Sequence, residues 1–140
     1  MSHLALYRVS HALWKAHIPL LPHLLARLHR LLSGAVVPPS CTIGHGSKLA
    51  YGGRGVVIHA RAVVGRDCVI SPGVVIGGRS GYSDVPHIGD RVLLWPGAKV
   101  LGPVVVGDGA QVGANAVLIE SAPAGSIYVA PLGRFLEELT

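Results

Sequence analysis

Aliphatic residues recur with a six-residue period between Val37 and about Pro123, and two interruptions break the period. A glycine often follows the aliphatic residue, and a small or β-branched residue recurs four positions after it. Neither an α-helix nor a plain β-strand has this period. The period therefore predicts a coil of six-residue arms. The aliphatic positions are Val37, Ile43, Leu49, Ile58, Val64, Ile70, Ile76, Ile88, Leu94, Val100, Val106, Val112 and Leu118.

The simplest coil with this repeat is a three-sided one. Three arms make a turn, the aliphatic residue points into the interior, and glycine allows the sharp corner. Stacked turns then pair as short parallel strands, so that each turn buries the face of its neighbour. The pattern resembles the left-handed parallel β-helix of the hexapeptide-repeat acyltransferases, and the handedness follows from that resemblance alone, since the usual crossover preference is right-handed.

The segments flanking the repeats predict two helical additions to a mainly β protein. Residues 2–33 form two amphipathic helices separated by Pro19 and Pro22, and Ser33-Gly34 ends the second helix. After the repeats we expect a last strand at Ile127–Ala130 and a short helix near Leu132–Leu139. We therefore divide the chain into an N-terminal helical hairpin, residues 1–35, and a β-helix domain with its C-terminal cap, residues 36–140.

The hairpin has two alternative roles. It is amphipathic and basic, which is typical of a helix lying on an anionic membrane. The exposed end of a solenoid must also be covered, and this favours a hairpin that caps the coil and packs between subunits. Both roles are compatible with one structure.

The two interruptions predict the position of a binding site. Tyr51–Gly55 adds three residues between arms, and Gly77–His87 forms a longer insertion. Insertions in a solenoid bulge outward, and bulges gathered on one face commonly form its binding site.

Composition narrows the class of partner. The formal charge of +5 is compatible with an anionic partner, whereas scattered Lys and Arg with few aromatic residues do not favour nucleic acid. The two cysteines, Cys41 and Cys68, occupy inward positions of different arms, so we expect buried reduced thiols in a cytoplasmic protein. We see neither a signal peptide pattern nor an apolar run long enough to span a bilayer.

Three short segments of the sequence resemble a more specific family. Gly55–His59, Ile76–Gly78 and Gly97–Pro103 are similar to segments of serine acetyltransferases and their polysaccharide-modifying relatives. The resemblance implies a homotrimer that binds acetyl-CoA and a hydroxyl acceptor in the groove between neighbouring subunits. In that family a histidine removes the acceptor proton, and backbone amides stabilise the oxyanion.

Three departures from the serine acetyltransferase pattern bear on the acceptor. Ala50-Tyr51 replaces the family's Asp-His pair, Val36 replaces the Asp that orients the histidine, and Asp84-Val85 replaces an Arg-His pair. Without a basic group at these places to hold an amino-acid carboxylate, we expect a carbohydrate hydroxyl as the acceptor, as in surface polysaccharide assembly at the cytoplasmic face of the membrane. The alternatives are a catalytically degenerate scaffold protein and a serine O-acetyltransferase.

The candidate active site consists of nine residues. We expect three catalytic residues, His59, His87 and Tyr51, because they lie beside the two insertions. Of these, His59 is favoured as the base. The resemblance implies a groove for the pantetheine arm of acetyl-CoA, formed by Gly77, Gly78, Ala98, Gln111, Gly113 and Ala114. At the wall of this groove, Trp95-Pro96 replaces the Gly-Ala of the family. We expect no metal, because the histidines lack close-spaced partners.

Overall fold

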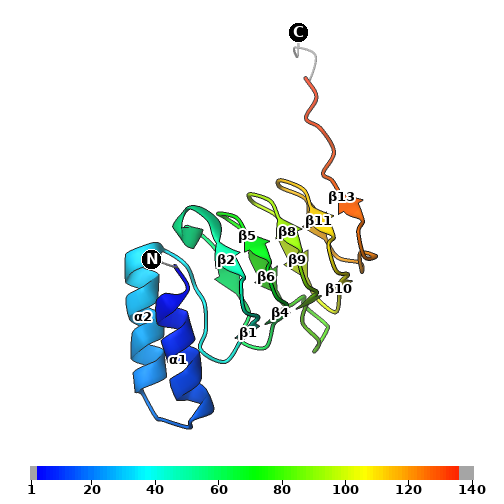
Figure 1. Cartoon of the computed structure of the whole chain (residues 1–140). Helices are drawn as coiled ribbons and strands as arrows, with labels where there is room; N and C mark the ends of the chain where they lie inside the picture. Colours follow the sequence, from blue (N-terminus) through cyan, green and yellow to red (C-terminus); the bar gives the residue numbers. More distant parts are fainter. Residues whose placement is uncertain (1–2, 136–140) are drawn as a thin grey trace.

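The computed structural model describes residues 3–135 and shows a parallel β-helix with a helical hairpin across one end (Figure 1). Its short strands stack into three faces, each joined by parallel ladders. Face 1 contains β1 (Thr42–Ile43), β4 (Val63–Val64), β7 (His87–Ile88) and β10 (Val105–Val106). Face 2 contains β2 (Lys48–Leu49), β5 (Val69–Ile70), β8 (Leu93–Leu94), β11 (Gln111–Val112) and β13 (Ile127–Tyr128). Face 3 contains β3 (Val57–Ile58), β6 (Val75–Gly77), β9 (Lys99–Leu101) and β12 (Val117–Leu118).

The six-residue phasing predicted the interior correctly. Every aliphatic position of the repeat is at most 4 % exposed, and the small residues four positions further on are buried as well. Ladder partners such as Ile58 and Ile76 stack directly above one another along the axis. The fold is the predicted left-handed parallel β-helix.

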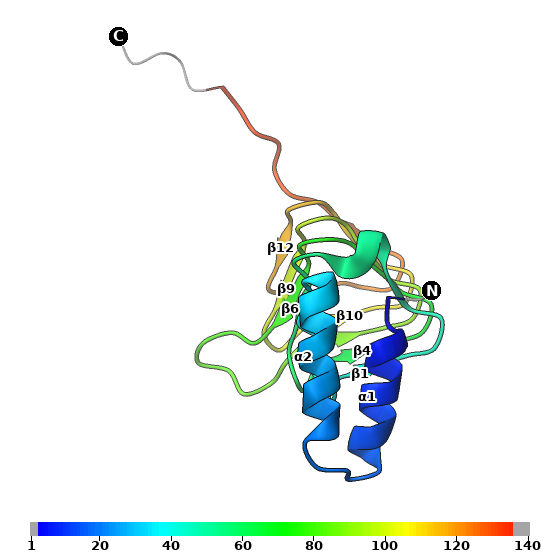
Figure 2. The same cartoon turned by 90° about the vertical axis from the view of Figure 1, so that its left-hand side faces the viewer.

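The hairpin consists of α1 (Ala5–Lys15) and α2 (Leu21–Ser33), which run side by side across the first turn (Figure 2). Leu4 and Tyr7 belong to the same buried cluster as the interior of the solenoid. Gly34 ends α2 with a left-handed φ of 73°, as the sequence predicted. In the described part of the chain, no helix is long and apolar enough to cross a bilayer. The division of the chain at residue 35 stays a prediction.

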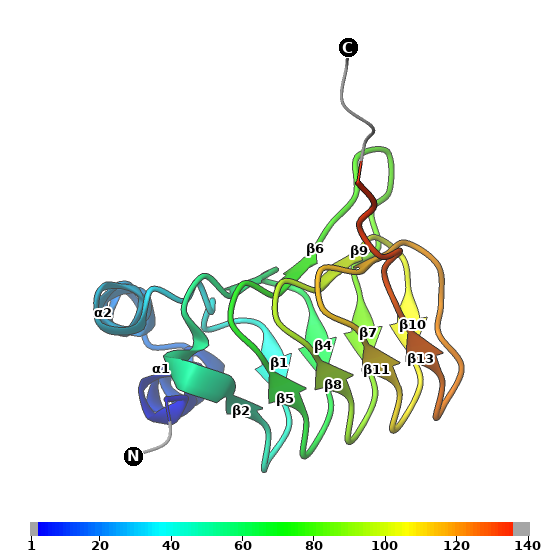
Figure 3. The ribbon, with the colours of Figure 1, turned by 90° about the horizontal axis from the view of Figure 1, so that it is seen from above.

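The two insertions lie at different corners, which the sequence did not predict. The first forms a short 3-10 turn, η1 (Ala50–Gly53), between faces 2 and 3. The second, residues 78–86, projects between faces 3 and 1 (Figure 3). They therefore flank the two opposite edges of face 3 and do not gather on one face of a single protomer.

The predicted C-terminal helix is wrong where it can be examined. Residues 131–135 have no regular secondary structure, and the rest of the predicted helix, 136–139, lies outside the described residues. Leu132 and Phe135 are almost fully exposed, so this segment has no surface to pack against. Helices this short are marginal without packing, and Gly133 weakens one further. The predicted last strand is present as the shorter β13.

Tyr7 anchors the hairpin to the first turn, and its replacement gives a stability prediction. Its buried hydroxyl donates to the carbonyl of Cys41 (2.7 Å) and accepts from the amide of Ile43 (3.0 Å). Tyr7→Phe leaves the Ile43 amide buried without its partner, which we expect to cost about 1–3 kcal/mol in the free energy of unfolding. Urea denaturation tests this, and the exposed Tyr82→Phe, which should change little, is the control.

Candidate active site

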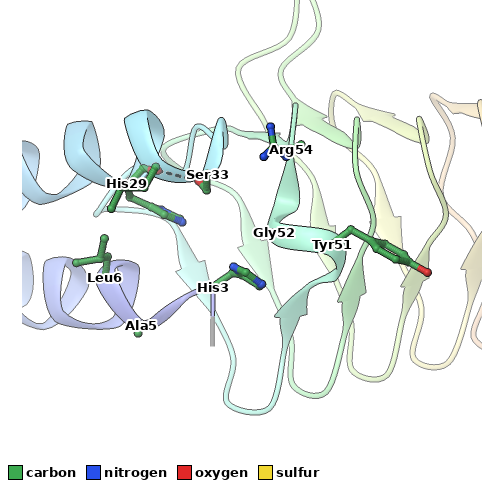
Figure 4. Close-up of a pocket in the computed structure, with 9 residues that line it drawn as sticks. His3, Ala5, Leu6, His29, Ser33, Tyr51, Gly52 and Arg54 are labelled. Atoms are coloured by element: carbon green, nitrogen blue, oxygen red, sulfur yellow. Dashed lines mark hydrogen bonds between the residues drawn. The ribbon is translucent and has the colours of Figure 1, made fainter. Parts of the chain in front are cut away.

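A pocket of about 340 Å³ lies where the hairpin meets the η1 turn, and we call it the junction pocket (Figure 4). It brings together residues from the start of α1, the end of α2 and the first insertion, three segments that are far apart in the sequence. It is lined by His3, Ala5, Leu6, His29, Leu32, Ser33, Tyr51, Gly52 and Arg54. No acidic side chain lines it, so the junction pocket suits an anionic group.

His29 is the unusual residue of the junction pocket. It is 2 % exposed, and neither ring nitrogen has a hydrogen-bond partner among residues 3–135. Burial lowers the pKa of His29. The nearby backbone of His3 raises this pKa in part, and the side chain of His3 lowers it further. His29 is therefore neutral at pH 7, with one donor and one acceptor available for a ligand or a water molecule.

The lowered pKa of His29 predicts an acid-sensitive fold. The folded state holds this imidazole neutral. The contribution of His29 to the free energy of unfolding should therefore be fully present above the unfolded-state pKa of about 6.5, and it should be lost as the pH falls below that value. His29→Gln, which cannot be protonated, should flatten this dependence below about pH 6.5. Urea denaturation across this range checks it, with the exposed His23→Gln as control; an equal acid slope in His29→Gln and wild type would contradict the prediction.

Arg54 and His3 supply the charge and hydrogen-bonding capacity of the junction pocket. The Arg54 guanidinium makes no hydrogen bond or ion pair within the described chain, so its donors are available. The His3 ring lies beside Gly52: a Cβ on that glycine would be 3.7 Å from the ring. Tyr51, by contrast, is 88 % exposed and points away from both histidines (Figure 4). Its positive φ of 49°, in the left-handed region, turns the ring outward.

His87 begins β7 on face 1, at the corner with face 3 and below the second insertion. It lines a cavity of about 430 Å³ together with Arg61, Asp84, Val85, Pro103, Val104 and Val105. Its exposed imidazole makes no hydrogen bond or ion pair with any described residue. Arg61 holds the loop above it by donating to the Ser83 carbonyl (2.5 Å). His87 is therefore a free histidine at the base of a fixed loop.

His59 shares this corner, but its ring is oriented by the backbone. Its Nδ1 accepts a hydrogen bond from the Arg61 amide (3.1 Å), so the neutral ring carries its proton on Nε2. The Nε2 edge faces the loop, 4.0 Å from the place of a Cβ on Gly78. In this arrangement Nε2 carries the ring proton and cannot accept another, so His59 is not suited to the role of base.

The residues expected to contact acetyl-CoA divide between the two edges of face 3. Gly77 ends β6 and Gly78 follows it, at the corner with His59, whereas Gly113 and Ala114 lie at the other corner, after β11. The structure gives a physical reason against contact with acetyl-CoA through the side chains of two other expected residues. Ala98 is fully buried, so its side chain faces the interior, and the side-chain amide of Gln111 is engaged by the Trp95 indole (3.1 Å).

Three other side chains with reactive groups, Lys99, Cys41 and Cys68, have structural roles. Lys99 donates to the carbonyls of Gly73 (3.2 Å) and Gly97 (2.6 Å) and so fixes a corner of the coil. Both cysteines are buried and free, as predicted. Burial raises the pKa of Cys41 to about 12 and raises that of Cys68 as well, which makes both poor nucleophiles at pH 7. Among residues 3–135, no three His, Cys, Asp or Glu side chains converge as metal ligands.

The six-residue period and the parallel β-helix define the class of protein first. Residues 86–120 match the bacterial transferase hexapeptide (six repeats) family. The fold and this match together define a hexapeptide-repeat transferase.

Relatives that align with nearly the whole chain identify the particular family. A serine acetyltransferase of Synechococcus elongatus is 36 % identical over 135 residues, 95 % of this chain and 55 % of the relative. A serine acetyltransferase of Helicobacter pylori is 38 % identical over 125 residues, 88 % of this chain and 72 % of the relative. A solved serine acetyltransferase in complex with CoA has a TM-score of 0.85 at 28 % identity, covering 96 % of this chain and 55 % of that one. The chain belongs to the serine acetyltransferase family.

The comparisons favour one side of the resemblance seen in the sequence. They support the serine acetyltransferase side and give no support to the polysaccharide-modifying branch. The chain spans a little over half the length of the Synechococcus relative and of the solved enzyme.

Proposed function

We propose that this protein is an acetyl-CoA-dependent O-acetyltransferase whose acceptor is L-serine. The observation that carries the proposal is a relative named serine acetyltransferase that aligns with the hairpin as well as the solenoid, and so with both walls of the junction pocket. Serine thus replaces the carbohydrate acceptor that the sequence alone favoured. A carbohydrate chain would also gain little from a small, basic recess at the end of the coil.

The junction pocket answers the sequence-based objection to serine. The family's Arg-His pair is absent from the second loop, but Arg54 and His3 offer a basic recess at another position. A guanidinium with free donors suits a carboxylate, which it can bind through two parallel hydrogen bonds. The volume of about 340 Å³ lies within the usual range of small-molecule sites.

The proposed active site lies between protomers of a homotrimer. Arg54 and His87 lie at opposite corners of face 3, so one protomer cannot bring them to the same substrate. In a closed three-fold ring, one corner of each subunit faces a different corner of the next. The second loop of one protomer would then reach the junction pocket of its neighbour. The pantetheine arm would lie between the small residues at one edge of face 3 and those at the opposite edge of face 3 in the neighbour.

His87 is the residue we assign as the general base, in place of His59. The serine hydroxyl oxygen attacks the thioester carbonyl carbon while His87, whose ring has no other partner, accepts its proton. The C–S bond then breaks, and the proton passes from His87 to the CoA thiolate. His59 donates from Nε2 to the carbonyl oxygen, where negative charge develops.

Arg54→Gln tests how the acceptor is held. Losing a charged hydrogen-bond donor to the carboxylate costs about 1.5–3 kcal/mol, so we expect the KM for serine to rise about 10- to 100-fold, with a much smaller change in the KM for acetyl-CoA. Steady-state kinetics measures both constants. Arg66→Gln, an exposed arginine at another corner, is the control and should leave both unchanged. An unaltered KM for serine in Arg54→Gln would remove Arg54 from the site.

The function itself is tested by release of CoA thiol in the presence of L-serine, D-serine, a panel of sugars, or no acceptor. We expect release with L-serine and formation of O-acetyl-L-serine by mass spectrometry. Turnover with sugars but not with serine would contradict the acceptor. Failure to bind acetyl-CoA in calorimetry at about millimolar concentration, above the usual range of KM, would favour the scaffold alternative.

A further inference from the structure

The apolar face of α2 points away from the protein. The six leucines of this helix fall within about 120° of its circumference. The residues that α2 buries lie on a different side, namely Pro22 and His29. Leu24 is 56 % exposed and Leu31 is 83 % exposed, so the row is uncovered in the protomer. We call Leu21, Leu24, Leu28, Leu31 and Leu32 the leucine face.

The arrangement differs from that of an ordinary surface helix, which buries its apolar stripe. Here the polar side of α2 meets the body of the protein: the Pro22 carbonyl accepts from Ser10 (2.7 Å), and His29 lines the junction pocket. A contiguous exposed row of leucines marks a binding surface.

The charge beside the leucine face favours an anionic occupant. His23, Arg27 and Arg30 occupy an adjoining arc of about 60° on the same helix. Eight of the twelve Lys and Arg residues precede Asp67, which is the first acidic residue of the chain. The hairpin therefore has no acid of its own to neutralise the arginines.

We infer that the leucine face and its adjoining arginines form a docking surface for an anionic lipid bilayer. The helix lies in the plane of the interface, the leucines enter the acyl boundary, and the arginines meet the lipid phosphates, as amphipathic interfacial helices do. A second copy of the chain is the less suitable occupant, since pairing two such faces brings Arg27 and Arg30 together with those of the partner, without an acid nearby. This inference does not depend on the proposed reaction.

Vesicle co-sedimentation of the full chain tests the inference. We expect binding to phosphatidylcholine vesicles that contain phosphatidylglycerol, little binding to phosphatidylcholine alone, and release near 1 M salt, where the screening length falls to about 3 Å. Leu24→Ser with Leu31→Ser should weaken binding about 10- to 100-fold. Leu132→Ser with Phe135→Ser, which removes two even more exposed apolar side chains outside the hairpin, should not.

A second variant separates charge from apolar contact. Arg27→Gln with Arg30→Gln should weaken binding about fivefold per arginine and reduce its salt dependence. The inference is overturned if the anionic vesicles do not sediment the protein, or if the leucine variant binds them as wild type does. It is also overturned if light scattering without vesicles shows an assembly that the leucine variant splits, because the leucine face is then covered by a second copy.

Discussion

His87→Ala should lower kcat for acetyl transfer to L-serine about 10²- to 10⁴-fold, the contribution expected of a general base. The unpaired, exposed imidazole of His87 is available to accept a proton, and removing it leaves water as the only acceptor. The KM for serine should change little, because Arg54 carries the binding. Steady-state CoA release at saturating substrates measures the effect.

Two other histidines give this experiment its controls. His59→Ala should cost less than His87→Ala, because the Nε2 proton of His59 only stabilises charge on the carbonyl oxygen. His45→Ala should have no effect, since His45 is exposed on a plain turn. If His59→Ala abolishes activity and His87→Ala retains it, the base assigned from the sequence is right and the assignment made from the structure is wrong.

Gly65→Ala should lower the free energy of unfolding by about 2–4 kcal/mol, more than any conservative substitution on the surface of the coil. The reason is space and not conformation. A Cβ at Gly65 would lie 2.4 Å from the carbonyl oxygen of Gly89 in the next turn and 2.4 Å from the Asp90 carboxylate, which accepts from the Arg66 amide. The turns stack too closely at this corner for a side chain.

Gly133→Ala is the matched control for this substitution. No atom lies within 4 Å of a Cβ at that position, so we expect a change within about 0.5 kcal/mol. Urea denaturation of both variants measures the difference. A Gly65→Ala protein as stable as wild type would show that the turns can separate at this corner.

Repetition made the interior predictable from the sequence. Each six-residue arm repeats the same local rule, so a residue such as Val64 has its environment fixed by its phase. The helices of the hairpin followed for a related reason, since their ends carry Pro22 and Gly34. The direction of the leucine face did not follow, because an amphipathic pattern does not specify which neighbour the helix will meet.

The candidate site was predicted only in part, because it depends on contacts between distant segments. Nothing near Arg54 in the sequence indicates that His3 and His29 lie beside it. The clue that was available is the five histidines in residues 1–33, considered only as metal ligands. The sequence-based objection to serine was incomplete for the same reason: it examined the family's own positions for a basic group, whereas the chain offers one from a different insertion.

The most direct test of the shared site mixes two damaged proteins. Arg54→Gln and His87→Ala are co-expressed with different affinity tags, and mixed trimers are assayed for acetyl transfer at serine concentrations below KM. If the pocket of one protomer works with the loop of the next, one of the three sites in each mixed trimer regains both residues, and activity rises to about a third of wild type. Mixed trimers no more active than the average of the two separate variants would contradict a site between protomers.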